Sequence, residues 1–427
     1  MDTVTTVMWF RRDLRLTDNP AVLDAAAGGR VLGLFVLDPL LWGRSGDPRR
    51  EHLAASLRSL SESMGGRLVV RRGDPAVVVP AVADEVAASS VHICADYAPY
   101  GQQRDVQVEA ALKCPLVRTG SPYAVAPGRI RNQHGRPYQV FTPYFKAWLA
   151  HGWRQPVAAP TDVTWAEAPS EELPAGSVEA GEGMALERWR SYDPAGYEAE
   201  RDRPDLDSTS RMSIPLKYGE IHPRTMLAGL ESEAYRRELA WREFCADLLV
   251  RYPQAAWKPL RPEFERTAYD EPGSAYEAWR SGRTGFPFVD AGMRQLAATG
   301  LMHNRVRMVV ASFLVKDLHV HWKYGARWFM RSLTDGDLAS NALNWQWVAG
   351  CGADTAPYFR IFNPVAQGLK FDPHGDYVRR WIPELRHLAG KQAHEPWEHD
   401  TGDYPAPIAD HAEARREALR RYDAIRS

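Results

Sequence analysis

The sequence predicts a two-part fold: an α/β domain with a doubly wound parallel sheet, followed by an all-α domain. Up to about residue 125, short β-branched runs alternate with alanine-rich helical stretches, which is typical of parallel βαβ units. Beyond Leu186 the strand signal disappears and apolar residues recur with helical spacing. A chain of 427 residues is long enough to bury the cores of two or three domains.

Five short apolar runs predict the strands, because buried parallel strands are apolar on both faces. The runs are "VTTVMWF", "RVLGLFVLD", "GRLVVRRG", "SVHICAD" and "PLVRTG". The helical stretches between them predict right-handed crossovers. Such sheets bind ligands at the carboxyl ends of their strands. No GxGxxG follows the first run, so a nicotinamide-type dinucleotide site is not expected there.

We place the α/β domain at residues 1–125, a linker at residues 126–186 and the helical domain at residues 187–427. Residues 157–187 contain seven Asp or Glu and no Lys or Arg, together with several Pro and Gly. This composition predicts an acidic, solvated connector draped over the surface. Helical periodicity then governs "YRRELAWREFCADLLVRY", "VDAGMRQLAATG", "HNRVRMVVASFLVKDLHVHW" and "ARWFMRSLTDGDLASNALNWQWV".

Charge and cysteine content restrict the possible functions. The net charge is −1, but residues 280–331 hold nine Lys or Arg against two acids, so this segment is either a polyanion-binding surface or a solvated helical face. The four cysteines lie far apart, which argues against disulfides and structural zinc and favours the reducing cytoplasm. The N-terminus does not match a signal peptide, and no apolar run is long enough to span a membrane.

Two motifs carry groups suited to a nucleotide. "STSRMS", from Ser208, precedes a helical pattern, so its hydroxyls either bind phosphate or simply cap the helix. "LTDGDLASN" places Asp335 and Asp337 around Gly336 and ahead of Asn341. These carboxylates either cap a helix or hold a ribose and a ring. A metal would need further ligands, and none is evident.

Two further motifs place polar groups beside apolar ones on a helix face. Glu238 precedes Trp241 by three residues, and Asn304 precedes Met308 by four. Each pair is either ordinary packing or one wall of a pocket for a polar ring. The stretch "NALNWQWVAGCGADTAPYFRIFNP" adds aromatic rings interleaved with amides, typical of a core or a binding surface.

Together these blocks resemble the DNA photolyase/cryptochrome family, and within it the class I enzymes that split cyclobutane pyrimidine dimers. The resemblance covers nearly the whole chain, and its ordered set of motifs is far more specific than any one of them. It begins at "MWFRRDLRLTDNPAV" and runs through "YEAERDRP", "TSRMS", "ELAWREF", "TGFPFVDAGMRQL", "MHNRVRM", "DGDLASNALNWQWVAGCGADTAPYFRIFNP", "KFDPHGDYVRRWIPEL" and "PIADHAEARREAL". It implies an antenna domain, a linker and a helical domain that holds FAD in a bent conformation.

The resemblance implies which residues contact FAD. The diphosphate and flanking contacts would be Tyr197, Thr209, Ser210, Arg211, Met212 and Ser213. The ribose and isoalloxazine contacts would be Asp335, Gly336 and Asp337, with Arg307 as the partner of Asp335 and Asn341 facing flavin N5. An Asn at this position resembles photolyases, whereas plant cryptochromes usually carry Asp and insect ones Cys. An amide neither gives up a proton readily nor repels a reduced, anionic flavin.

The resemblance also implies a wall for damaged DNA. The residues that match it are Arg201, Glu238, Trp241, Asn304, Arg305, Met308 and Trp347. Enzymes that act on a base extrude it from the duplex, and a damaged pair unstacks cheaply. Trp241 and Trp347 would stack on the dimer, and Glu238 would supply a hydrogen bond or proton to a pyrimidine carbonyl. Photolyases specific for (6-4) lesions carry histidines at the positions of Asn304 and Met308, so the sequence disfavours that substrate.

An electron path is also implied, from Trp345 through Trp322 to an outer aromatic residue. Counting back from Trp279 places the outer member at Tyr269, where the family pattern has tryptophan. The reaction implied is light-driven: excited FADH⁻ lends an electron to the dimer and recovers it after the ring splits. The cofactor would carry the chemistry, while the protein supplies positioning and electrostatics. Contacts to DNA phosphates would weaken with salt.

The antenna chromophore stays open between a deazaflavin, methenyltetrahydrofolate and an empty site. Arg11, Asp38 and Glu109 lie where one could be held, or are structural charges. The rival functions are a cryptochrome-type photoreceptor without repair and, less favoured, a DNA-binding flavoprotein without enzymatic activity. The sequence shows no long extension of the kind that signalling members usually carry at the C-terminus. We expect a monomer whose partner is damaged DNA, with no metal and no membrane association.

Overall fold

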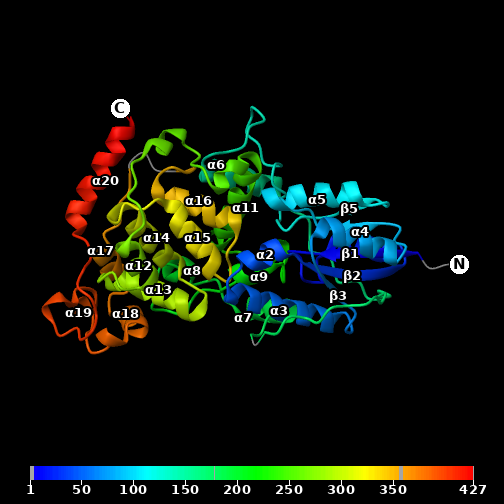
Figure 1. Ribbon diagram of the computed structural model, residues 1–427, viewed down its shortest axis with the longest axis horizontal. Helices are drawn as coiled ribbons and strands as arrows, with labels where there is room; N and C mark the ends of the chain where they lie inside the picture. The colour runs from blue at the N-terminus through cyan, green and yellow to red at the C-terminus, as the bar shows by residue number, and fades with distance from the viewer. Residues whose placement is uncertain (1–3, 177, 355–358, 427) are drawn as a thin grey trace. The chain divides into compact units, whose positions relative to one another are not determined.

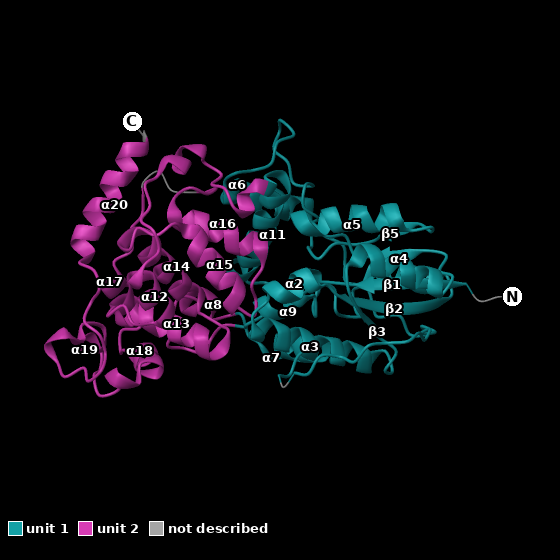
Figure 2. Cartoon of the chain, viewed as in Figure 1, with its two compact units in different colours: residues 1–194, 210–253 teal, residues 195–209, 254–427 magenta. Residues whose placement is uncertain are grey.

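The computed structural model describes residues 4–176, 178–354 and 359–426, so residues 355–358 of the aromatic motif lie outside the described part. The chain forms two compact units, which Figure 2 shows in different colours. Unit 1 comprises residues 1–194 and 210–253, and unit 2 comprises residues 195–209 and 254–427. Each unit is described by itself below. The domain boundaries at residues 125 and 186 stay predictions.

Unit 1 contains a five-stranded parallel sheet of order β3-β2-β1-β4-β5 (Figure 1). The strands are β1 (Thr5–Phe10), β2 (Arg30–Leu37), β3 (Val69–Arg72), β4 (Val91–Ile93) and β5 (Leu116–Arg118). All five runs predicted from the sequence are strands, and the α/β fold class is confirmed. The order of the strands reverses between β1 and β4, which is where doubly wound sheets bind ligands.

Helices cover both faces of this sheet. They are α1 (Pro20–Ala27), α2 (Pro39–Arg44), α3 (Asp47–Ser63), α4 (Pro75–Glu85) and α5 (Pro99–Ala111). Along β1, Met8 and Phe10 pack in one buried cluster with residues of α1 and α3. Trp9 faces the other way, into a second cluster with residues of α4 and α5. This alternation follows from the two-residue period of a strand.

The acidic segment after the sheet is held against unit 1. Ala166 donates its backbone N–H to the carbonyl of Val31 in β2 at 2.8 Å. The Glu182 carboxylate accepts from the backbone N–H groups of Leu16 and Thr17 at 2.8 and 2.9 Å. The segment therefore lies along the α/β unit as predicted, but specific hydrogen bonds fix it there.

Residues 210–253 also pack in unit 1, which no sequence pattern indicated. Their helices are α9 (Ser213–Tyr218), α10 (Pro223–Leu227) and α11 (Glu233–Arg251), and the unit also holds α6 (Phe141–His151) and α7 (Glu182–Ser191). The buried Arg224 guanidinium pairs with Asp18 at 2.7 Å. Arg15 donates to the carbonyl of Gly219 at 2.9 Å. Buried charges must be paired, so these contacts strongly favour this packing.

Unit 2 is helical. Its α-helices are α8 (Tyr197–Glu200), α12 (Ser274–Ser281), α13 (Pro287–Thr299), α14 (Asn304–Ser312), α15 (Trp322–Ser332), α16 (Leu338–Ala349), α17 (Pro364–Phe371), α18 (Asp376–Trp381), α19 (Lys391–His394) and α20 (His411–Arg426). A π-helical turn, η3 (Phe313–Asp317), follows α14, and short 3-10 turns are η1 (Pro253–Ala256), η2 (Pro262–Arg266), η4 (Pro383–Leu385) and η5 (Pro396–Glu398). One cluster of buried apolar side chains, from η2 to α20, forms its core. Within the described ranges, no helix combines the length and apolarity needed to cross a membrane.

Candidate functional site

An arginine–aspartate pair lies at the start of the polar motif in unit 2. Arg307, on α14, donates from Nη2 to Oδ2 of Asp335 at 2.9 Å and from Nε to the carbonyl of Met302 at 2.7 Å. Asp335 is buried, whereas the guanidinium is about a quarter exposed. The pairing predicted from the sequence is therefore present. It fixes one positive charge in a defined position.

Asp337 has a structural role that the sequence left open. Its carboxylate accepts from the backbone N–H of Ser340 at 3.0 Å, and it is the N-cap of α16. The neighbouring Gly336 leaves little room, because a Cβ there would lie 3.2 Å from the carbonyl oxygen of Leu333. This hydrogen bond uses Oδ1 of the Asp337 carboxylate.

The side chain of Asn341 is oriented by the neighbouring helix. Its Nδ2 donates to the carbonyl of Ala326 in α15 at 2.9 Å, so its amide oxygen is directed elsewhere. The residue is half-buried. In this orientation Asn341 presents a hydrogen-bond acceptor, which is the group that a ring N–H requires.

Trp345 belongs to the core of unit 2. Its ring centroid lies 5.0 Å from that of Phe329 and 6.3 Å from that of Trp279, both in edge-to-face arrangements. Gly325 of α15 allows this packing, because a Cβ there would lie 2.1 Å from Cη2 of Trp345. The sequence indicated the aromatic density here but not which rings meet, so the role of Trp279 as a neighbour was missed.

Trp322 and Tyr269 are joined through a histidine. The ring of His321 lies 4.5 Å from that of Tyr269 and 5.6 Å from that of Trp322. Over the described ranges, no ring contact joins Trp322 directly to Trp345, although Trp345 packs against Gly325 in the first turn of the helix that Trp322 begins. Burial lowers the pKa of His321 to about 4, so this imidazole is neutral at pH 7.

Trp347 is only partly buried, in contrast to Trp345. Its indole N–H donates to the carbonyl of Asp354 at 3.1 Å, and the Arg360 guanidinium lies 5.6 Å from its ring centroid. With its polar edge satisfied within the protein, Trp347 has mainly its ring face to offer to a ligand. Trp345 is buried and Trp347 is half-buried, so this motif contributes to both the core and the surface.

The start of α14 carries the remaining predicted substrate residues of unit 2. Asn304 is its first residue and is exposed, and Met308 is half-buried one turn later. Arg305 is already engaged, because its Nη2 lies 2.6 Å from Oδ2 of Asp202 and its guanidinium lies 4.3 Å from the ring centroid of Phe371. Asn304 is therefore the exposed member of this group, whereas Met308 and Arg305 are both half-buried.

Residues 195–209 supply three more predicted contacts to unit 2. Tyr197 begins α8, and the Arg201 guanidinium lies 5.4 Å from its ring centroid. Thr209 is half-buried and is the last residue of this segment. The rest of the phosphate motif, from Ser210, belongs to unit 1.

In unit 1 the phosphate motif has an irregular backbone. Arg211 has φ of 55°, in the left-handed region that non-glycine residues rarely adopt. Ser210 shares a hydrogen bond of 2.6 Å with the hydroxyl of Tyr235, and burial raises the pKa of that phenol. The hydroxyl of Ser210 also accepts from the backbone N–H of Met212, the N-cap residue of α9, at 3.4 Å. Met212, which is buried, and Ser213, which is exposed, lie at the N-cap and first position of α9.

The predicted pair on α11 lies further along unit 1. Glu238 and Trp241 are both half-buried on this helix. The ring of Trp241 lies 4.3 Å from that of Phe141 and 5.4 Å from that of Phe244, so it is braced from α6 and from its own helix. A braced indole with one accessible side is a rigid stacking surface.

Comparison with known proteins shows to which family this chain belongs. A family model described as DNA photolyase matches residues 6–162, and one described as the FAD binding domain of DNA photolyase matches residues 235–424. The deoxyribodipyrimidine photo-lyase of Streptomyces griseus is 42% identical, over 96% of this chain and 97% of its own. The chain belongs to the DNA photolyase family. It is therefore a photolyase enzyme of DNA repair, and FAD is its cofactor.

Solved photolyase-family structures agree with this assignment. A bacterial class III photolyase from Agrobacterium tumefaciens has a TM-score of 0.91 at 36% identity, covering 100% of this chain and 98% of its own. A cryptochrome from Synechocystis sp. PCC6803 also has a TM-score of 0.91, at 27% identity, covering 98% of this chain and 100% of its own. The family therefore includes both repair enzymes and cryptochromes with this fold.

The three candidate antenna residues lie at two different places in unit 1. Arg11 follows β1 and pairs with Asp105 at 2.6 Å, and Asp38 follows β2 and caps α2. Glu109 lies at the surface of α5, paired with Arg118 at 2.7 Å. Arg11 and Asp38 thus lie at the carboxyl edge of the sheet, where doubly wound folds bind ligands, while Glu109 is occupied elsewhere.

Proposed function

We propose that this photolyase is a class I enzyme that splits cyclobutane pyrimidine dimers in DNA under blue light. The observation that carries the proposal is the character of the α14 surface, which presents Asn304 and Met308 instead of imidazoles. An amide can hydrogen-bond a pyrimidine carbonyl, and a thioether packs against an apolar ring edge. Neither group can donate the proton that an imidazolium would bring to a (6-4) product.

The residues that would hold FAD suit its chemistry. When bound and reduced, FAD supplies an electron on absorption of light. Asn341, whose Nδ2 is bound to Ala326, would accept from a ring N–H through its amide oxygen, and Arg307, held by Asp335, would supply positive charge to a reduced ring. Tyr197, Thr209, Ser210, Arg211, Met212 and Ser213 would hold the diphosphate and its flanks.

Other residues would hold the damaged DNA. Trp241 and Trp347 are both half-buried, and each would stack on a pyrimidine. Glu238 would supply a hydrogen bond to a pyrimidine carbonyl as negative charge develops on the dimer. Arg201, Arg305 and Asn304 would complete the wall, with Arg305 held in place by Asp202.

A separate electron path would let the enzyme reduce its own flavin. It would run from Trp345 through Trp322 to Tyr269. The ring of His321 lies between the last two, 4.5 Å from that of Tyr269 and 5.6 Å from that of Trp322, and is neutral at pH 7 because burial lowers its pKa to about 4.

A second chromophore would bind at the carboxyl edge of the sheet, near Arg11 and Asp38. The absorption spectrum of the purified protein would distinguish a deazaflavin from a folate. The enzyme would act as a monomer in the cytoplasm. A cryptochrome-type receptor without repair is the alternative function, favoured only by the likeness to the Synechocystis structure.

Illumination of two damaged oligonucleotides tests the proposal. Purified, reduced enzyme should restore thymine dimers under blue light, leave (6-4) products unchanged and do nothing in the dark. Repair of the (6-4) lesion alone would refute the substrate, and repair of neither lesion would favour the receptor function.

A further inference from the structure

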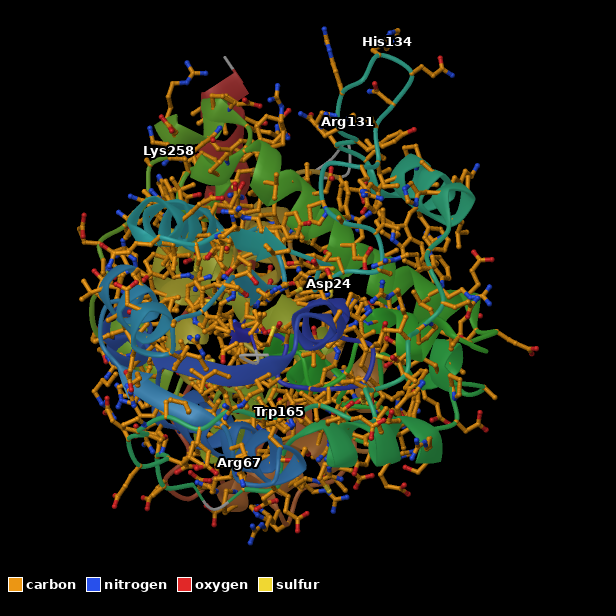
Figure 3. All side chains as sticks on the ribbon, turned by 90° about the vertical axis from the view of Figure 1, so that its right-hand side faces the viewer. Asp24, Arg67, Arg131, His134, Trp165 and Lys258 are labelled. Carbon is orange, nitrogen blue, oxygen red and sulfur yellow. The ribbon has the colours of Figure 1, made fainter. Side chains whose placement is uncertain are left out.

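A basic, acid-free stretch lies in unit 1, outside the residues assigned so far. Residues 110–161 contain seven Lys or Arg and no Asp or Glu, although the whole chain has a net charge of −1. Within this stretch, Arg129, Arg131 and Arg136 are exposed on a loop of residues 128–139, referred to below as the basic loop. Figure 3 shows Arg131 and His134 on this loop, which extends away from the helices of its unit.

The basic loop has a defined conformation. Asn132 organises its tip, because its side-chain oxygen accepts from the backbone N–H groups of His134 and Arg136 at 2.9 and 3.0 Å. The backbone N–H of Asn132 also donates to the carbonyl of Arg136 at 2.8 Å. Gly135 completes the turn with φ of 71°. Binding through this loop would therefore cost less ordering entropy than binding through a flexible one.

Two acidic residues of α11 anchor the start of the basic loop. The Asp247 carboxylate accepts from the backbone N–H of Gly128 at 2.5 Å. One turn earlier, the buried Glu243 accepts from the backbone N–H of Val125 at 3.0 Å and from the indole N–H of Trp148 at 2.7 Å. The loop is thus bound to the helix that also carries Glu238 and Trp241.

The end of the basic loop lies close in sequence to a residue that contacts Trp241, a proposed substrate residue of the same unit. Phe141 begins α6 two residues after the loop, and its ring lies 4.3 Å from that of Trp241. The three arginines are therefore displayed from a segment that packs directly against an indole assigned to the dimer. A stretch of DNA that placed its lesion on Trp241 would bring neighbouring phosphates towards this segment.

The chemistry of the basic loop fits phosphate. Its exposed side chains are those of Arg, Gln and His, and its one large aliphatic residue, Ile130, is buried. Guanidinium groups bind phosphate oxygens with two parallel hydrogen bonds, whereas insertion into a lipid surface would require exposed apolar groups. Phosphate contacts also carry no sequence information, as a repair enzyme that must act at any sequence requires.

We propose that the basic loop is a second DNA-binding element, in which Arg129, Arg131 and Arg136 bind phosphates of the strand flanking the lesion. This inference rests on the proposed function for its ligand, damaged DNA, but concerns residues that the proposed function does not use. The loop increases affinity for any DNA, and the helix that anchors it positions the dimer.

The experiment compares DNA binding by a loop variant and a matched control. In the loop variant Arg129, Arg131 and Arg136 are changed to Gln; in the control the exposed Arg30, Arg44 and Arg190 of the same unit are changed to Gln. Binding of the FAD-loaded proteins to undamaged and dimer-containing duplexes is measured in the dark by fluorescence anisotropy at several salt concentrations. Since each lost phosphate contact reduces the slope of log K against log salt by about 0.9, the loop variant should lose about 2–3 units of slope.

The expected result is a Kd raised about tenfold or more for both duplexes in the loop variant, with the control unchanged. An unaltered slope and Kd in the loop variant would overturn the inference and leave an acidic protein as the partner to be sought. A variant with three Lys at the same positions should keep the wild-type slope, and an equal loss in that variant would show that charge is not what the loop contributes. Because undamaged DNA is bound in darkness, a protein that failed to repair dimers could still show this loop dependence, so the two proposals can fail separately.

Discussion

Replacement of Gly325 by Ala tests how closely Trp345 is packed against α15. The new Cβ would lie 2.1 Å from Cη2 and 2.6 Å from Cζ3 of Trp345, and 2.6 Å from Cδ2 of Leu314. Trp345 is buried and packs against Phe329 and Trp279, so a shift of its ring would disturb both contacts. Forcing an extra methyl group into such a core costs about 1–3 kcal/mol.

The higher helix propensity of alanine acts in the opposite direction and reduces this loss of stability. Alanine in place of glycine within a helix stabilises by about 0.4–1 kcal/mol when the site is compatible. The net expectation is a destabilisation of about 0–2.6 kcal/mol, with a midpoint of about 1.3 kcal/mol that lowers Tm by about 3–5 °C. Gly183→Ala is the matched control, because Gly183 lies in helix α7 with no atom within 4 Å of a Cβ.

Thermal unfolding followed by circular dichroism and by release of FAD fluorescence measures both variants. Gly325→Ala should unfold at a lower temperature than wild type, and Gly183→Ala at the same or a slightly higher one. If Gly325→Ala were as stable as Gly183→Ala, the packing of Trp345 against α15 described above would be wrong.

Three further changes probe other parts of the account. Trp345→Phe should abolish light-driven reduction of oxidised flavin while leaving repair by pre-reduced enzyme, measured by absorbance spectroscopy and dimer restoration; unchanged photoreduction would refute the electron path. Glu238→Ala should slow dimer repair without releasing FAD, whereas full repair efficiency would remove its assigned role. His321 caps α15 by accepting from the N–H of Lys323, and burial lowers its pKa to about 4, below the ordinary value of 6.5. The unfolded state therefore binds more protons between those values, so stability should be full above pH 6.5 and fall towards pH 4. His321→Asn keeps a cap but cannot titrate, and denaturation at pH 7 and pH 5 should show a smaller loss than wild type; an equal loss would place the effect elsewhere.

The sequence predicted the α/β sheet well because a buried parallel strand can be recognised from a short local run of apolar residues. The central run that ends at Leu37 is apolar and buried on both faces, whereas β3 and β5 are apolar only in part. The association of residues 210–253 with this unit could not be predicted, because it depends on pairs distant in sequence, such as Asp18 with Arg224. The hydrogen bonds that fix Ala166 and Glu182 are equally non-local.

The candidate site was predictable to the extent that motif order identifies residues. The Arg307–Asp335 pair followed from the resemblance, whereas capping by Asp337 was one of two alternatives that the sequence left open. Ring contacts such as that of Trp345 with Trp279 required the packed structure. The basic stretch at residues 110–161 can be read from the sequence, but it was not predicted. The net charge of the chain is −1, and residues 280–331 contain more Lys and Arg than this stretch does.

We propose that this photolyase uses light to split cyclobutane pyrimidine dimers, and that Trp241 and Trp347 each contribute to binding them. The most direct measurement follows the recovery of thymine absorbance in a dimer-containing oligonucleotide, with the reduced enzyme illuminated in the flavin band. We expect recovery in proportion to absorbed light, and a much smaller yield per absorbed photon when both tryptophans are replaced by alanine. Recovery that continued in darkness, or that ignored both replacements, would contradict the claim.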